Sequence, residues 1–112
     1  MAHFNEHCRD CEGLLGDRCE DVNRWLDECF KQYGPLHRFV RHHVEGAEEA
    51  GKLFGEKGRK AALIHILKDC GKIPTVEQWK NKEVDVLGID PCTPFNGYWD
   101  IKEFDEVAKN LV

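Results

Sequence analysis

Histidine and carboxylate side chains recur at helical spacing in this chain, and both hold divalent metal ions or transfer protons. His65 and Asp69 are four residues apart, which places both on one face of a helix. Upstream, His43 stands where an apolar residue would continue the buried stripe of its own helix. If the two helices form an antiparallel pair, His43 and His65 approach each other. The pattern therefore predicts a site made of His43, His65 and Asp69.

A second histidine pair, His3 and His7, has the same four-residue spacing near the N-terminus. Such a pair on a helix can chelate zinc or another divalent ion. Asp69 suits either a ligand or a partner that orients an imidazole. We therefore predict His3, His7, His43, His65 and Asp69 as metal ligands, with zinc as the candidate cofactor. The structural alternative is a hydrogen-bonded packing role for His43 and a simple ion pair of His65 with Asp69.

His37, Arg41 and Glu45 follow one another at four-residue intervals and form a second candidate site. On a continuous helix they would share one ridge, which could clamp an anion or serve acid–base chemistry. The alternative is a solvated helix face with paired charges, which adds little stability. No serine nucleophile motif, glycine-rich phosphate loop or His-Glu-x-x-His motif is present, so no catalytic class follows from a motif.

The cysteines offer a weaker metal motif. Cys8-x2-Cys11 resembles half of a zinc-finger site, but Cys19 and Cys29 do not provide the second pair at suitable spacing. No βαβ pattern surrounds the motif, which argues against a thioredoxin-like redox role. The N-terminal residues lack the basic and apolar regions of a signal peptide, so we expect a cytoplasmic protein with reduced thiols.

Glycine and proline divide the chain into about five helical pieces that must position these residues. We expect helices over about 2–15, 17–33, 35–54 and 59–70, a short helix after Thr75 and a last helix from about Asp100. Thr75 and Gln78 form a capping box, and residues 84–98 read as an extended, turn-rich segment with room for one short strand. On a continuous 35–54 helix, His43 faces inward, His42 points away and His37 borders the stripe.

Composition and charge favour a soluble, mainly α single domain over residues 1–112, with a helical core in 1–80 and an extended segment plus helix in 81–112. Apolar residues make up 41% and charged residues 33%, which excludes a disordered chain. The net charge of −5 is distributed as −4, +3 and −4 over residues 1–34, 35–72 and 73–112. This lacks the dense basic face of a nucleic-acid binder, and no apolar run is long enough to span a membrane.

The order His37-Arg38-x-x-Arg41-His42-His43-x-Glu45-Gly46, then His65-x3-Asp69-Cys70-Gly71, then Ile73-Pro74-Thr75-Val76 and Trp79, resembles a family of short uncharacterised bacterial and bacteriophage proteins. The likeness covers roughly residues 1–80. It implies a small helical protein from a phage or mobile element, with the histidines and Asp69 belonging to the pattern. The family brings no activity with it.

Two functional hypotheses follow. The first is a non-enzymatic binding or accessory protein that acts through a protein partner or self-association. The second is a divalent-metal-binding protein or a metal-dependent hydrolase that uses the His/Asp residues, where a bound ion would activate a water molecule near neutral pH.

Overall fold

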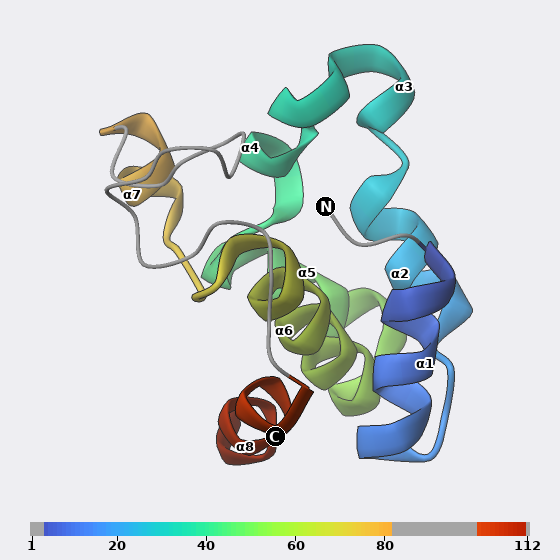
Figure 1. Cartoon of the computed structure of the whole chain (residues 1–112). Coiled ribbons are helices and arrows are strands. Elements are labelled where there is room, and N and C mark those ends of the chain that lie inside the picture. Colours follow the sequence, from blue (N-terminus) through green and yellow to red (C-terminus); the bar gives the residue numbers. More distant parts are fainter. Residues whose placement is uncertain (1–3, 82–100, 112) are drawn as a thin grey trace.

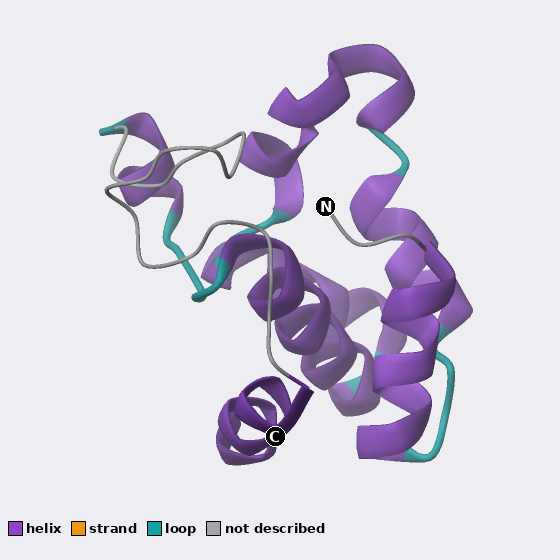
Figure 2. Ribbon diagram, viewed as in Figure 1, coloured by secondary structure: helices purple, strands orange, loops and turns teal. Residues whose placement is uncertain are grey.

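The structure, a computed structural model, describes residues 4–81 and 101–111, and all regular elements in these ranges are helices (Figure 2). The helices are α1 (Phe4–Leu15), α2 (Glu20–Asp27), α3 (Phe30–Tyr33), the 3-10 helix η1 (Gly34–His37), α4 (Arg38–Arg41), α5 (Val44–Phe54), α6 (Glu56–Cys70), α7 (Val76–Lys80) and α8 (Ile101–Leu111). The predicted mainly α fold is confirmed. The segment predicted to be extended, 84–98, lies outside the described residues.

The long helix α6 forms the centre of the fold. In Figure 1 it lies between α1 and α2 on one side and α8 on the other, and all three helices contact it. Residues 61–67 of α6 are buried on every side, as expected for a helix that is apolar around its whole circumference. No helix within the described ranges is long and apolar enough to cross a membrane.

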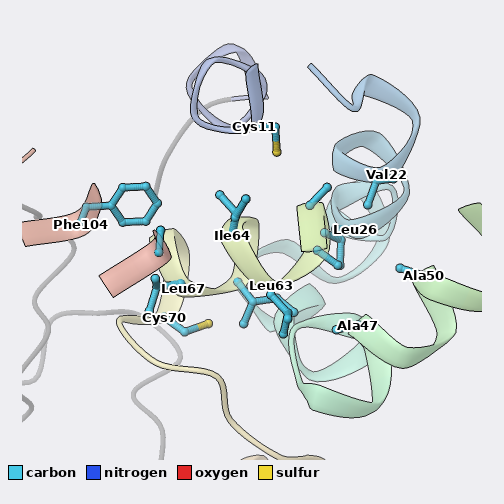
Figure 3. Close-up of a cluster of buried hydrophobic side chains, with 14 of the residues drawn as sticks. Cys11, Val22, Leu26, Ala47, Ala50, Leu63, Ile64, Leu67, Cys70 and Phe104 are labelled. Atoms are coloured by element: carbon cyan, nitrogen blue, oxygen red, sulfur yellow. The ribbon is translucent and has the colours of Figure 1, made fainter. Parts of the chain in front are cut away.

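A helical hairpin of α5 and α6 supplies much of the apolar core (Figure 3). Gly55, with a φ of 86°, is the single residue between the two helices, and this left-handed conformation suits glycine. A Cβ atom on Gly58 would come within 2.5 Å of the Phe54 Cβ, so the absent side chain lets the helices approach closely. The small residues Ala47, Ala50 and Ala61 continue this close contact.

The prediction of one continuous helix over 35–54 was wrong. The helix is interrupted between Arg41, where α4 ends, and Val44, where α5 begins. His43 adopts an extended conformation and forms the N-cap of α5, with its side chain accepting a hydrogen bond from the Gly46 amide. Backbone groups freed by the break find partners elsewhere. The Val44 N–H donates to the Pro74 carbonyl, and the Trp79 indole N–H donates to the His42 carbonyl at 2.7 Å. These two hydrogen bonds compensate in part for the helical hydrogen bonds that the interruption removes.

The helix predicted over 17–33 is also divided, into α2 and α3. It begins at Glu20 rather than at Asp17, because Cys19 has a φ of 50° and its N–H donates to the Asp17 carboxylate at 2.9 Å. The capping box of Thr75 and Gln78 is confirmed, with both reciprocal hydrogen bonds formed.

Candidate metal centre

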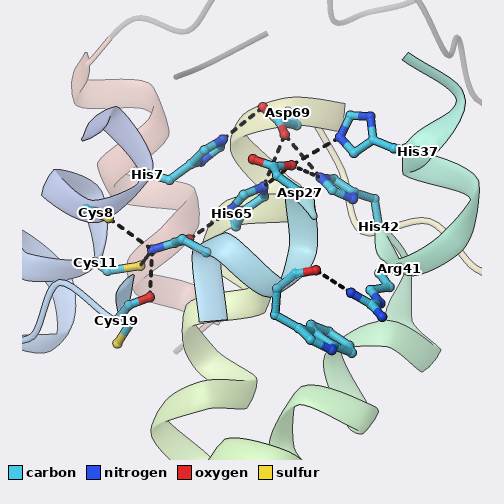
Figure 4. A network of polar contacts seen from close by, with 12 residues as sticks. His7, Cys8, Cys11, Cys19, Asp27, His37, Arg41, His42, His65 and Asp69 are labelled. Atoms are coloured by element: carbon cyan, nitrogen blue, oxygen red, sulfur yellow. Dashed lines mark hydrogen bonds and ion pairs between the residues drawn. The ribbon is translucent and has the colours of Figure 1, made fainter. Parts of the chain in front are cut away.

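Histidine and aspartate side chains from distant parts of the chain meet at one buried position beside α6 (Figure 4). This cluster consists of His7 from α1, Asp27 from α2, His37 from η1, His42 from the α4–α5 junction, and His65 and Asp69 from α6. Only Asp27 has an appreciably exposed side chain, at 29%, while the other side chains are fully buried.

Asp69 contacts three imidazoles with its two carboxylate oxygens. Its Oδ2 lies 3.2 Å from the His42 Nε2 and 3.3 Å from the His65 Nε2. Its Oδ1 lies 3.2 Å from the His7 Nε2. The i,i+4 spacing within α6 brings His65 and Asp69 together, as the sequence predicted.

Asp27 faces the same imidazoles from the end of α2. Its Oδ1 lies 3.1 Å from the His37 Nε2, 3.3 Å from the His65 Nε2 and 3.5 Å from the His42 Nε2. His42 and His65 therefore each contact both carboxylates, and the two carboxylates bracket their Nε2 atoms.

The ligand atoms of Asp27, His42, His65 and Asp69 all lie within 4.8 Å of one another. Two bonds of about 2.0–2.1 Å at a tetrahedral angle separate ligand atoms by about 3.3–3.4 Å. The nitrogen–oxygen distances among these residues, 3.2–3.5 Å, match that separation. We call these four residues the metal centre.

The hydrogen bonds of Asn23 fix the tautomer of His65. The Asn23 side-chain amide group donates to the carbonyls of Arg18 and Cys19, both at 3.1 Å, so its Oδ1 must face the other way. That Oδ1 accepts a hydrogen bond from the His65 Nδ1–H at 2.9 Å. In neutral His65 the Nε2 then carries a lone pair, and this lone pair points at two carboxylates. A proton or a metal ion must occupy the position between them.

His37 has the same arrangement. Its Nδ1–H donates to the Gly34 carbonyl at 2.7 Å, which leaves Nε2 to face Asp27. The left-handed Gly34, with a φ of 59°, and the short η1 helix orient this imidazole.

Burial and charge shift the protonation of the cluster in opposite directions. Burial lowers the pKa of His42 to about 4, although Asp69 opposes the shift. Burial also disfavours the imidazolium of His65, but the hydrogen bonds and charges of Asp27 and Asp69 outweigh it and raise that pKa to about 9. Burial would raise the pKa of both aspartates, yet their histidine partners hold it well below the usual range. Two carboxylates therefore stay ionised here, a charge that one divalent ion would neutralise.

The predicted ligands His7, His65 and Asp69 are brought together, but His43 is not part of the cluster. Both ring nitrogens of His43 are used locally, since Nδ1 accepts from the Gly46 N–H at 2.8 Å and Nε2 donates to the Val40 carbonyl at 3.0 Å. The expectation that His42 points away was wrong, because the break before α5 turns His42 inward instead. His3 lies outside the described residues.

The predicted ridge of His37, Arg41 and Glu45 does not exist as a continuous surface, because the helix is interrupted. His37 belongs to the cluster, and Arg41 donates to the Glu28 carboxylate and lies over the Trp25 ring at 4.2 Å. Glu45 accepts from the Val76 N–H at 3.2 Å. A binding role for these residues stays a prediction.

Cys8 and Cys11 are buried thiols whose sulfur atoms lie beside the Asn23 amide, at 3.8 and 3.6 Å. Burial raises the pKa of Cys11 to about 12, so this thiol stays protonated. Their role is to pack against the residue that orients His65.

Sequence reasoning missed Asp27 and Asn23 as site residues. Both lie on α2, four residues apart, and face His65. The available hint was that Asn23, a polar residue, lies next to Val22 and near Leu26 on the apolar face of the helix, where it is fully buried. Such a residue reads equally well as part of a solvated helix face.

Residues 2–86 match the family described as a domain of unknown function (DUF6915). No curated protein and no solved structure matches the chain. The matched region contains every residue of the cluster. Because the match covers more than half of its length, this chain belongs to the DUF6915 family.

Proposed function

We propose that this protein binds a divalent transition-metal ion at the metal centre of Asp27, His42, His65 and Asp69. The observation that carries the proposal is the orientation of His65, whose Nδ1–H is committed to Asn23 while its Nε2 faces both carboxylates. An ion at this position would replace a proton and neutralise Asp27 and Asp69 together.

The donor set indicates which ions are suitable. Imidazole nitrogen favours zinc, iron, cobalt and similar borderline ions, while Ca²⁺ and Mg²⁺ prefer oxygen-only shells. Two imidazoles with two carboxylates therefore favour Zn²⁺, Fe²⁺, Co²⁺ or Mn²⁺ over the alkaline-earth ions.

The burial of the metal centre favours a binding role rather than catalysis at this ion. Three of its side chains are fully buried and the ligands come from α2, the α4–α5 junction and α6. Structural metal sites are closed in this way, whereas catalytic sites keep an open position. The ion would hold these segments together, so its binding free energy would add to the free energy of unfolding.

A second candidate function is metal-dependent hydrolysis, which the 29% exposure of the Asp27 side chain favours. Within the described part of the chain, Asp27 is the ligand through which a substrate could reach the centre. Hydrolysis of a chromogenic phosphoester that depends on added Mn²⁺ or Zn²⁺, and is lost in Asp27→Asn, would support it. Equal rates in the two proteins would rule it out.

Metal analysis of the protein purified without a histidine tag tests the binding proposal. We expect about one equivalent of metal per chain after incubation with Zn²⁺ and gel filtration. The matched control is the double variant His65→Gln, Asp69→Asn, which should retain less than about a tenth of an equivalent. Equal metal content in both proteins would contradict the proposal.

A further inference from the structure

His7 is a buried imidazole that the metal centre does not use. Its side chain is fully buried, yet among the described residues neither ring nitrogen forms a hydrogen bond of normal geometry. Leaving buried polar atoms without partners is costly, and native proteins rarely do so without a reason. The His7 Nε2 nevertheless lies 3.2 Å from the Asp69 Oδ1, so the ring points at a carboxylate oxygen.

The orientation of His7 prevents it from sharing the ion of the metal centre. Its ring is stacked on the His65 ring, with the centroids 3.5 Å apart and the planes at 10°. An imidazole binds a metal ion along its lone pair, in the plane of the ring. Two nearly parallel rings therefore direct their lone pairs to two separate positions, one facing each oxygen of Asp69 (Figure 4).

We propose that the cluster holds a second divalent ion between the His7 Nε2 and the Asp69 Oδ1, with Asp69 as a bridging carboxylate. The first ion would take the Asp69 Oδ2, which faces His42 and His65. The ring centroids are 3.5 Å apart, so ions held in the two ring planes would be separated by a similar distance, which is compatible with the separation of about 3.5–4 Å between the metals of two-metal sites. This inference rests on the proposed function, because a bridge requires the first ion.

The two positions differ in how completely protein ligands fill them. The first has four protein ligands, whereas the second has His7 and Asp69 among the described residues. The smaller number of ligands among the described residues makes the second position the weaker and more exchangeable site.

Electron paramagnetic resonance of the protein with Mn²⁺ tests this proposal directly. We expect about two equivalents bound at saturation, with a spin-coupled signal whose hyperfine spacing is half that of an isolated Mn²⁺ ion. Such coupling requires the two ions to share a bridging ligand.

The variant His7→Phe keeps a flat ring on His65 and removes the ligand. We expect it to bind about one equivalent with an isolated-ion signal. His43→Asn is the control, because both ring nitrogens of His43 are hydrogen-bonded locally, and it should keep two coupled ions.

Three results would contradict the second ion. The first is wild-type protein that saturates at one uncoupled equivalent, and the second is wild-type protein that binds two uncoupled ions. The third is a His7→Phe variant that still binds two coupled ions. Absence of any bound ion in the wild-type protein would overturn the proposed function as well, so the two failures can be told apart. The wild-type spectrum decides even if His7→Phe does not fold.

Discussion

At the scale of single residues, Asn23 supports the proposed metal centre by orienting one of its ligands, His65. The Asn23 amide group donates hydrogen bonds to the backbone carbonyls of Arg18 and Cys19. This fixes the position of its Oδ1, which accepts a hydrogen bond from His65. Mutating a group that orients a metal-binding histidine typically lowers metal affinity by about 10- to 100-fold.

Replacing Asn23 with alanine removes the acceptor for the His65 Nδ1–H and frees the ring to change its tautomer. We expect metal affinity to fall by about 10- to 100-fold. The free energy of unfolding of the metal-free protein should fall by about 1–3 kcal/mol, because a buried donor loses its partner. Isothermal titration with Zn²⁺ and chemical denaturation measure the two effects. An unchanged affinity would show that Asn23 does not orient His65.

The neighbouring residues His42 and His43 offer a matched pair of variants. His42→Asn removes a ligand and should abolish Zn²⁺ binding at micromolar concentrations. His43→Asn should keep the affinity and most of the stability, because asparagine is a favourable N-cap for α5. The same titration compares them. The opposite order of affinities would restore His43 as the ligand.

Residue identities alone could not separate these two histidines. By contrast, the four-residue spacing of His65 and Asp69 correctly predicted that they lie side by side, because one regular helix carries both. The roles of His42 and His43 depend on a chain break that Pro74 and Trp79 stabilise from more than 30 residues away. Asp27 was missed for a similar reason, because its imidazole partners come from η1, the α4–α5 junction and α6, which only tertiary packing brings together.

At the scale of elements, the α4–α5 junction decides which side chain enters the cluster. Gly46 makes the junction possible, since a Cβ atom there would lie 1.9 Å from the Arg41 carbonyl oxygen. The sequence predicted the helical pieces around this junction but joined them into one. The helical spacing of apolar residues continues across the interruption. In addition, His43 forms the N-cap of α5, and histidine is not among the common N-cap residues, so no sequence signal marks a new helix there.

Substitution Gly46→Ala should therefore destabilise the protein by at least about 3 kcal/mol, because backbone must move to relieve the overlap. Gly13→Ala is the control. It lies within α1 with no atom near its Cβ position, so alanine should stabilise the helix by about 0.5–1 kcal/mol. Denaturant titration measures both. A stable Gly46→Ala variant with intact metal binding would contradict the role given to this junction.

At the scale of the whole molecule, the cluster couples folding to protonation, and the proposed metal ion would add to this coupling. The folded pKa of His65, about 9, exceeds its ordinary value of 6.5. Its contribution to stability is complete below pH 6.5 and is lost as the pH rises toward 9. The folded pKa of His42, about 4, is lower than 6.5, so stability falls as the pH decreases from 6.5 to 4.

The metal-free protein should therefore be most stable near pH 6.5, with a loss of stability on both sides. With Zn²⁺ bound, the ion takes the place of the His65 proton, and the loss above pH 6.5 should disappear. Thermal unfolding from pH 5 to 9, with and without a chelator, measures this difference. Identical profiles in the two conditions would show that metal and proton do not compete for His65.

The most direct test of metal binding is anomalous diffraction from a crystal grown with Zn²⁺ and measured at the zinc absorption edge. We expect an anomalous peak about 2.0–2.2 Å from ligand atoms of Asp27, His42, His65 and Asp69. A crystal with zinc bound elsewhere on the chain and no peak among these four residues would contradict it.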